Sequence, residues 1–301
     1  MNIIRMTGGL GNQMFQYALY LKLKSMGRTV KMDDESEYHM DNSRPIMLWA
    51  FDAEYPKADK DEINELTDGS LDFASRVRRK LFGRKSLEYH EKDNNFDEQV
   101  LLREPAYLTG YFQSERYFAD VKEQVRDAFR FSEKIWEEIP EKLKKTMKDY
   151  QEKITHSQAV AVHIRRGDYL EVSEVYGGIC TEDYYRKAIS LLKERFPGAV
   201  FYVFSNDPDW ASQWAARYST EENPFVVIEG TTEETGYLDL LLMSSCKHYI
   251  IANSSFSWWG AWLGNSPDKC VIAPSLWLNG KDCRDIYTED MIRISPAGEV
   301  R

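Results

Sequence analysis

The sequence lacks the features that mark several large classes of protein. None of its apolar runs approaches the roughly 20 residues that a membrane-spanning helix needs, and the opening MNIIRMTGG has no apolar core of a signal peptide. Basic residues are the minority, and the net charge is −10. That charge opposes long-range attraction to nucleic acid or an anionic membrane, so an anionic ligand must be small and held by a local basic pocket. We expect a cytoplasmic protein, free or peripheral to the inner face of the membrane.

Signatures of bound metals and common cofactors are also missing. The four cysteines form no CxxC pair and lie in or near apolar runs, which predicts buried free thiols rather than a zinc site: Cys180, Cys246, Cys270 and Cys283. The segment GGLGNQ, residues 8–13, follows neither the GxGxxG spacing of dinucleotide-binding proteins nor the GK[ST] ending of a P-loop. We therefore expect no resident cofactor.

What is present is an alternation of strand-like and helix-like segments over 301 residues, 43% of which are apolar. We predict two α/β domains, residues 1–154 and 155–301, with a charged helical boundary region that ends near Lys153. The first domain opens with a strand at Asn2–Met6, a glycine-rich turn at Thr7–Gln13 and a helix at Met14–Gly27. Segments 29–33 and 106–113 are predicted as strands, whereas 34–105 reads as surface helices and loops.

The second domain has a clearer pattern. Near-continuous apolar runs of β-branched and aromatic residues predict a parallel sheet buried on both faces. These runs are AVAVHI at 159–164, AVFYVF at 199–204, FVVIE at 225–229, HYIIAN at 248–253 and CVIA at 270–273. Helices are predicted between several of them, at 183–196, 235–246 and 255–264, which makes the sheet doubly wound.

Polar residues follow three of these strands. They are HIRRGDY after the first, FSNDPDW after the second and ANSSFSWW after the fourth. Because parallel strands end at one edge of the sheet, where ligands of open α/β sheets bind, the three segments are predicted to converge on one site. A guanidinium of Arg165 or Arg166 would then grip a phosphate through two hydrogen bonds. Asn253, Ser254 and Ser255 would supply hydroxyls and amide groups at a helix start, which suits an anion.

Structural alternatives exist for each segment. The two arginines could be solvated or could pair with Asp168. The cluster Asn253–Ser255 could act simply as a helix cap, and Asn206, a candidate donor-binding residue, could instead close an Asx turn. In the first domain, Gly9 and Gly11 would let the backbone approach a ligand, and Asn12 and Gln13 would offer side-chain amides. We interpret that turn as the lip of a cleft between the domains.

Five segments, taken together, resemble a known family. GGLGNQMFQYALY, GYFQSERYF, VHIRRGDY, FYVFSND and IIANSSFSWWGAWL are similar to the blocks of the bacterial and animal α-1,2-fucosyltransferases, glycosyltransferase family 11, in the family's order and across nearly the whole chain. The resemblance implies the GT-B arrangement, two facing doubly wound α/β domains with the active site in the cleft between them. It also implies inverting transfer of L-fucose from GDP-L-fucose to the 2-hydroxyl of a terminal galactoside, without a divalent metal. In agreement, no DxD pair ends a strand, because the DPD of Asp207–Asp209 is interrupted by proline.

The resemblance also implies roles for individual residues. Arg165 would clamp the diphosphate, and His163 would lie near the nucleoside. Arg166 would bind donor phosphate or brace the loop through Asp168. Ser254, Ser255 and Ser257 would donate to the diphosphate. Asp239 would read the guanine edge, unless it is an ordinary exposed helix residue.

The general base and the acceptor are left open by the sequence. Asp168 is the nearest carboxylate of the motifs, but it is equally suited to orienting an arginine. Asn12 could hold the acceptor or the nucleotide. Two other functions remain alternatives: a glycosyltransferase with another GDP-sugar donor or linkage, and a catalytically silent protein that binds sugar or nucleotide. The sequence does not give the oligomeric state.

Overall fold

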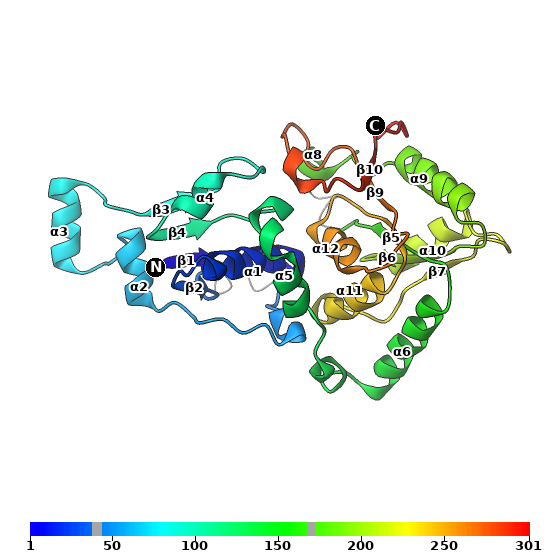
Figure 1. Cartoon of the computed structure of the whole chain (residues 1–301), viewed down its shortest axis with the longest axis horizontal. Coiled ribbons are helices and arrows are strands. Elements are labelled where there is room, and N and C mark those ends of the chain that lie inside the picture. Colours follow the sequence, from blue (N-terminus) through cyan, green and yellow to red (C-terminus); the bar gives the residue numbers. More distant parts are fainter. Residues whose placement is uncertain (38–43, 168–171) are drawn as a thin grey trace. The chain divides into compact units, whose positions relative to one another are not determined.

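The computed structural model describes residues 1–37, 44–167 and 172–301. The chain divides into two compact units, Met1–Arg130 and Phe131–Arg301, and Figure 1 shows that each is built around its own sheet. The sequence-based boundary was placed later, after residue 154. The helix before that point, α6 (Glu141–Thr155), packs on α11 (Gly236–Ser244). That packing assigns it to the second unit.

The first unit contains a parallel four-stranded sheet of order β2-β1-β4-β3. Its strands are β1 (Asn2–Arg5), β2 (Val30–Asp33), β3 (Glu88–His90) and β4 (Ala106–Thr109). Its helices are α1 (Leu10–Ser25), α2 (Lys60–Thr67), α3 (Phe73–Phe82), α4 (Glu98–Leu102) and α5 (Lys122–Ala128). α1 packs on β1 and β2, and α5 packs on α1. The predicted βαβ opening is confirmed, whereas β3 lay in the stretch read as surface helices and loops.

Helix α1 begins earlier than the sequence predicts. The glycine-rich segment was interpreted as a turn up to Gln13, but the helix starts at Leu10, with Gly9 in extended conformation as its N-cap. The Gln13 side chain explains the early start. Its Nε2 donates to the backbone oxygens of Gly8 and Pro45 at 3.0 Å each, and its Oε1 accepts from the Met47 nitrogen at 3.0 Å. These bonds offset the low helix propensity of Gly11 and Asn12.

The second unit contains a parallel six-stranded sheet of order β10-β9-β8-β5-β6-β7. The strands are β5 (Ala159–Ile164), β6 (Val200–Ser205), β7 (Phe225–Val227), β8 (His248–Ile250), β9 (Val271–Pro274) and β10 (Met291–Ile294). The first strand of the unit, β5, lies between β6 and β8. The chain therefore builds outward on one side of β5 and then returns to build on the other, which is the order of a doubly wound sheet.

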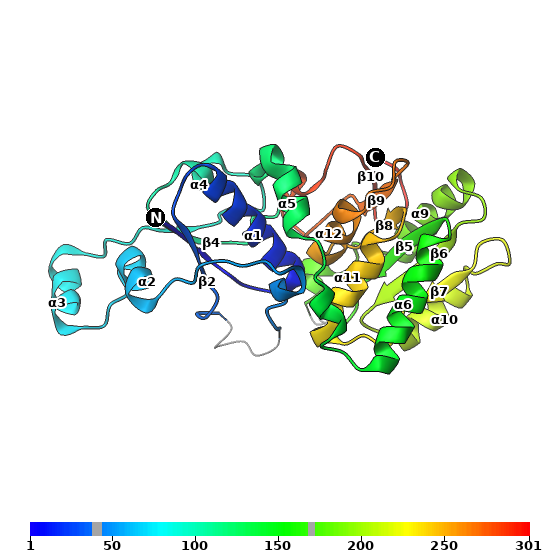
Figure 2. The same cartoon turned by 60° about the horizontal axis from the view of Figure 1, so that its bottom comes forward.

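Helices cover both faces of this sheet. α9 (Glu182–Arg195) and α10 (Pro208–Ala216) form one layer, and their buried residues share a core with Val160, Val162 and Phe201. On the other face α11 packs between α6 and α12 (Ser255–Leu263), as Figure 2 shows. A short helix, α8 (Ser173–Tyr176), precedes α9. The five predicted strands and three predicted helices of this half are confirmed, while α10 and β10 were not predicted.

Candidate functional site at the carboxyl edge of the second sheet

The three polar segments come together at one edge. They follow β5, β6 and β8, which are adjacent and parallel, so their carboxyl ends lie next to one another. The gap between β5 and β8 is the switch point of the sheet, where the chain turns from one direction of growth to the other. Ligands of doubly wound proteins bind in the crevice at this point. The predicted convergence of the segments is therefore confirmed by the topology.

Arg166 ties the loop after β5 to the loop after β6. Its backbone nitrogen donates to Oδ1 of Asn206 at 2.8 Å, and its Nε donates to Oδ2 of Asp207 at 3.2 Å. Its guanidinium carbon lies 4.0 Å from the centre of the Trp210 ring, a cation–π contact. The expectation that Arg166 braces the loop fits these interactions, with Asp207 as a partner. Asp168, the partner considered from the sequence, lies outside the described residues.

Gly167 fixes the path of the same loop. Its φ is +54°, a left-handed conformation that costs an L-residue roughly 1–2 kcal/mol. A Cβ atom at this position would lie 2.7 Å from Nδ2 of Asn206. Glycine is therefore required both by the backbone angle and by the close approach of the neighbouring loop.

His163 lies near the end of β5, and Arg165 directly follows the strand. His163 is buried, and its ring centre lies 5.8 Å from that of Phe256 on α12. Burial, and then the positive charge of Arg165, lowers the pKa of His163 to about 3. The imidazole is therefore neutral at physiological pH. Its Nδ1 has no hydrogen-bond partner among the described residues, so a buried polar atom at the switch point is left for a ligand to satisfy.

Serine residues open α12 on the other side of the switch point. Ser254 is the N-cap residue, yet its side chain makes no capping hydrogen bond. Ser255 is the first helical residue and is partly exposed. Ser257 is fully buried, and its hydroxyl donates to the Ser254 oxygen at 3.3 Å. The helix start thus presents backbone N–H groups together with the hydroxyl of Ser254, an arrangement that suits an anion.

Asn253 differs from these serines because its side chain is used within the fold. Its Nδ2 donates to the Trp277 oxygen at 3.1 Å, and its Oδ1 accepts from Sγ of Cys180 at 3.5 Å. The side chain is buried. These hydrogen bonds hold the turn after β8 against two other segments of the unit.

Asp239 lies in the first turn of α11, and α11 begins on the same edge because it leads from β7 back to β8. Thr231 donates its hydroxyl to the carboxylate at 3.0 Å from each oxygen. The residue is partly exposed, but its carboxyl oxygens are surrounded by protein, and this desolvation raises the pKa of Asp239 to about 7. It is thus not an ordinary exposed helix residue, and its charge responds to a donor placed against it.

The first unit has a comparable edge at the ends of β1 and β4. Asn12 accepts from Nε2 of Gln113 at 2.7 Å through its Oδ1, and Gln16 donates to the Gly110 oxygen at 2.9 Å. The predicted lip residues Gly9, Gly11, Asn12 and Gln13 thus lie at the N-terminal end of α1. Gln13 is fully buried with its amide bonded to backbone, so its observed role is to hold the turn.

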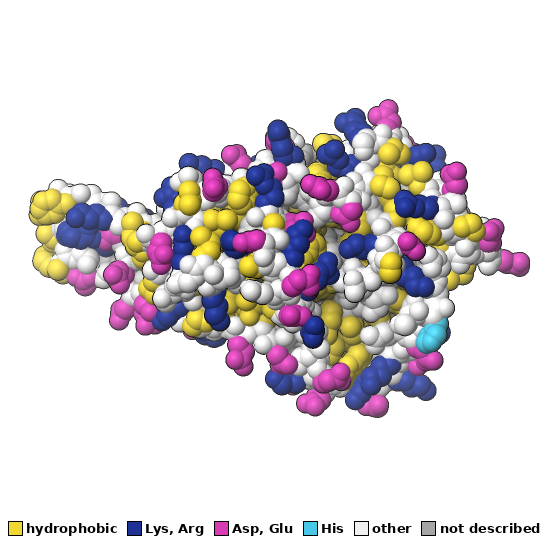
Figure 3. Space-filling model, viewed as in Figure 1, with side chains coloured by type: hydrophobic (Ala, Val, Ile, Leu, Met, Phe, Trp, Pro, Cys, Tyr) yellow, Lys and Arg dark blue, Asp and Glu magenta, His cyan; other side chains and the backbone are white. Residues whose placement is uncertain are grey.

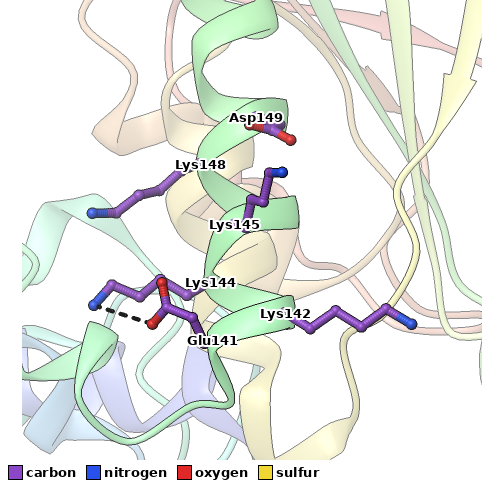
Figure 4. A pocket seen from close by; sticks show the side chains of 6 residues that line it. All are labelled: Glu141, Lys142, Lys144, Lys145, Lys148 and Asp149. Carbon is purple, nitrogen blue, oxygen red and sulfur yellow. Dashed lines mark ion pairs between the residues drawn. The ribbon is translucent and has the colours of Figure 1, made fainter.

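A separate hollow of about 400 Å³ lies along α6. All six lining residues come from that helix, and Figure 4 shows their side chains spreading in different directions: Glu141, Lys142, Lys144, Lys145, Lys148 and Asp149. A surface lined by one helix has no opposing wall to fix a ligand.

Within the described ranges, no group of three or more His, Cys, Asp or Glu residues could hold a metal ion. None of the helices in these ranges has both the length and the apolar character of a membrane span.

Sequence reasoning missed several residues that shape the edge. Asp207 is the N-cap of α10, with its Oδ1 accepting from the Trp210 nitrogen at 3.2 Å, while its other oxygen receives Arg166. The pair Asp207-Pro208 is a recognisable helix-start signal, and it could have identified Asp207 as the N-cap from the sequence. Thr231, the partner of Asp239, stands in a loop without any motif, so only the tertiary structure identifies it.

Two α/β units, each built on a parallel sheet, make up the GT-B fold, which confirms the predicted fold class. The model of the family described as glycosyl transferase family 11 matches residues 80–294. The chain belongs to that family and is a glycosyltransferase.

Individual relatives agree with this assignment. An α-1,2-colitosyltransferase of Escherichia coli is 33% identical over 97% of this chain and 98% of its own length. The human galactoside α-(1,2)-fucosyltransferase 1 is 28% identical over 60% of this chain and 48% of its own length. Among solved structures, a mutant of Arabidopsis thaliana FUT1 in complex with GDP shares the fold, with a TM-score of 0.51 and 11% identity over 90% of this chain and 69% of that one.

Proposed function

We propose that this glycosyltransferase moves L-fucose from GDP-β-L-fucose to the 2-hydroxyl of a terminal galactoside, with inversion at the anomeric carbon. The observation that carries the proposal is the switch-point edge of the second sheet. There the arginine loop after β5 and the serine-rich start of α12 flank the position where a doubly wound sheet binds a ligand. The five sequence blocks that resemble α-1,2-fucosyltransferases support the choice of L-fucose as the sugar and of the 2-hydroxyl as its acceptor position.

The donor would bind with its diphosphate between Arg165 and the start of α12. In the reaction the bond between the fucose anomeric carbon and the β-phosphate oxygen breaks, and the galactose 2-oxygen forms a new bond to that carbon. The electron pair of the broken bond goes to GDP, so negative charge grows on the β-phosphate. A guanidinium and helix N–H groups fixed in place before the reaction would stabilise that charge. Arg166, held by Asp207 and Trp210, would keep the loop and hence Arg165 in position.

Two further groups would recognise the nucleoside. The neutral imidazole of His163 has an Nδ1 without a hydrogen-bond partner in the part of the chain that the structure describes, and this atom can accept or donate a hydrogen bond according to its tautomer. Asp239 would accept from the N–H edge of guanine, and this contact would favour its ionised form. Uracil presents no comparable pair of donors, so Asp239 would favour GDP over UDP.

The proton of the galactose 2-hydroxyl must pass to a base as the new bond forms. The carboxylate that the motif offers, Asp168, lies outside the described residues, and its role as the base remains a proposal. An early break of the fucosyl bond would lower the demand on that base. Asn12 and the turn at Gly9–Gln13 are proposed to serve the acceptor.

A second donor has specific support. The relative that matches 97% of this chain is named a colitosyltransferase, and colitose is L-fucose without its 3-hydroxyl. A donor site that hydrogen-bonds this hydroxyl rejects colitose strongly, because the polar groups of the site would be left unpaired. A site with an apolar pocket at this position accepts colitose and rejects fucose only weakly. Comparing kcat/KM for GDP-fucose and GDP-colitose therefore distinguishes the two functions.

The first test measures nucleotide binding and transfer together. Calorimetry with GDP and UDP should give clearly tighter binding of GDP, and GDP-fucose with lactose should release GDP and yield a 2-linked fucoside. Transfer from GDP-colitose alone would replace the donor assignment, and binding of GDP with no transfer to any galactoside would refute the proposed acceptor. Activity is expected to survive EDTA, because arginine would supply the counter-charge, and loss of activity in EDTA that Mg²⁺ restores would refute metal independence.

A further inference from the structure

Helix α3 exposes the side chains that helices normally bury. Phe73, Val77 and Leu81 recur at four-residue spacing, so they share one face of the helix, and they are 81%, 39% and 69% exposed. The flanking Leu71 and Phe82 are 83% and 73% exposed. No residue of α3 is buried. A helix on a globular domain ordinarily turns such a stripe to the core, so the outward stripe requires another explanation.

The polar face of α3 is the one that faces the protein. Arg79 donates to the backbone oxygens of Asp68 and Ser70, at 3.0 Å and 2.6 Å, and Arg78 forms an ion pair with the Asp68 carboxylate. Just past the helix, Arg84 donates to the Thr67 oxygen at 2.9 Å. All of these acceptors stand at the end of α2 or directly after it. Figures 1 and 2 both show α2 between α3 and the sheet of the first unit, so the arginines fix the orientation that leaves the apolar stripe outside.

Positive charge surrounds this stripe although the chain as a whole is acidic. Residues 70–87 carry six Lys or Arg and one acidic residue, Asp72, a net charge of +5, against −10 for the whole chain. Arg76 and Lys80 are exposed and lie beside the stripe on the helix, and Lys85 is exposed just beyond it. Figure 3 shows hydrophobic and basic side chains gathered over α3. Large apolar side chains flanked by basic ones are typical of helices that lie in a membrane interface.

We infer that α3 is a membrane-surface helix that inserts Phe73, Val77 and Leu81 into the headgroup region of an anionic bilayer. Arg76, Lys80 and Lys85 lie at the level of the lipid phosphates. The occupant is a lipid surface rather than an acidic protein, because the patch combines an apolar stripe with charge and has no acidic residue within the helix. The expectation that net charge keeps the protein from anionic membranes is overcome locally, since electrostatic attraction falls off within a Debye length.

The test is co-sedimentation of the full chain with vesicles of equal parts phosphatidylglycerol and phosphatidylethanolamine. We expect binding that weakens as salt is raised, and weak binding to phosphatidylcholine vesicles. The triple variant Phe73→Ser, Val77→Ser and Leu81→Ser should reduce partitioning by at least about tenfold. The matched control, Met26→Ser with Leu102→Ser, removes exposed apolar side chains of the same unit and should bind as the wild type does.

A second pair of variants tests the charge. Arg76→Gln with Lys80→Gln should reduce binding to the anionic vesicles by about tenfold. The control Lys24→Gln with Lys92→Gln changes the net charge equally at exposed positions elsewhere in the unit and should change binding little. If both charge variants lost the same amount of vesicle binding, the attraction would depend on overall charge and not on α3, and the proposal would be overturned.

Other outcomes are equally decisive. Equal binding of the wild type and the triple variant, with unchanged circular dichroism and thermal transition in the variant, overturns the inserted stripe. A wild-type dimer that the triple variant converts to a monomer, measured by light scattering without lipid, would show that a second copy covers the patch. None of these readouts depends on the donor sugar, so failure here leaves the proposed function standing.

Discussion

Replacing Asp207 by alanine should loosen the arginine loop without touching the proposed phosphate ligands. One carboxylate oxygen caps α10 through the Trp210 nitrogen, and the other accepts from Nε of Arg166, each at 3.2 Å. The backbone bond from Arg166 to Asn206 and the stacking of Arg166 on Trp210 do not involve Asp207. The substitution therefore removes the helix cap and the ion pair and leaves the backbone bond and the stacking intact.

The magnitude follows from the cap and the ion pair that the substitution removes. Loss of an Asp N-cap costs about 1 kcal/mol. The ion pair is partly exposed, with side-chain accessibilities of 26% for Arg166 and 40% for Asp207, and such pairs contribute about 0.2–1 kcal/mol. We expect Asp207→Ala to lower the free energy of unfolding by about 1.5 kcal/mol, which corresponds to roughly 3–6 °C in Tm for a unit of this size. Asp207→Asn keeps an oxygen for the cap and should cost about 0.5 kcal/mol.

The assay is urea unfolding followed by steady-state kinetics. Asp59→Ala is the matched control, because Asp59 caps α2 in the first unit and should cost about 1 kcal/mol in stability with no kinetic effect. Asp207→Ala should in addition lower kcat/KM for transfer by roughly tenfold, because a displaced loop misplaces Arg165. This kinetic part depends on the proposed function, whereas the stability part does not.

Two results would refute the reasoning. If Asp207→Ala and Asp207→Asn were both as stable as the wild type, the carboxylate would not hold these loops together. If stability fell as expected but kcat/KM were unchanged, the Arg166–Asp207 ion pair would stabilise the fold without positioning Arg165.

Three further predictions address the same edge. Arg165→Ala should lower kcat/KM by an amount that corresponds to a loss of at least about 3 kcal/mol in transition-state stabilisation. Arg165→Lys should restore little of this loss, because a point charge cannot replace the two-pronged guanidinium. Near-normal turnover of Arg165→Ala would refute the assignment of Arg165 as the phosphate clamp. Asp239 has its pKa raised from 3.8 to about 7, so the folded state favours the protonated form and stability falls as pH rises between these values. Asp239→Asn should therefore be more stable than the wild type by on the order of 1–2 kcal/mol at pH 8 and equal to it near pH 4 in urea unfolding, and it should lose the preference for GDP over UDP. Gly167→Ala should cost roughly 1–2 kcal/mol from the left-handed backbone and should weaken GDP binding in calorimetry, whereas Gly178→Ala, also at positive φ but with no atom near the added carbon, should show the backbone cost alone.

Much of the fold was predictable because its signals are local. The runs AVAVHI and AVFYVF are long and apolar enough to require burial on both faces, and they became β5 and β6. The three-residue strand β3, Glu88–His90, carries no such run. It forms by pairing with residues 107–109 of β4. No pattern within residues 88–90 themselves indicates this pairing.

The start of α1 shows the same limit from the opposite side. Three glycines and an asparagine in residues 7–13 argued against a helix before Met14, and local propensity was a fair guide to that segment taken alone. The buried amide of Gln13 bonds to residues 45 and 47, and these tertiary bonds moved the helix start to Leu10. The charged segment that ends in α6 was likewise assigned by its packing on α11 rather than by its composition.

The sequence by itself determined which chemical groups the site has and which strand ends carry them, since a polar cluster directly after a buried run can emerge nowhere except at that end of the sheet. The tertiary structure decided which groups are neighbours. Folding placed β5 between β6 and β8, brought Arg166 to Asp207 and Thr231 to Asp239, and left the apolar stripe of α3 exposed. The physical reason is that hydrophobic patterning acts within a segment, whereas hydrogen bonds, ion pairs and desolvation depend on atoms that only folding brings together.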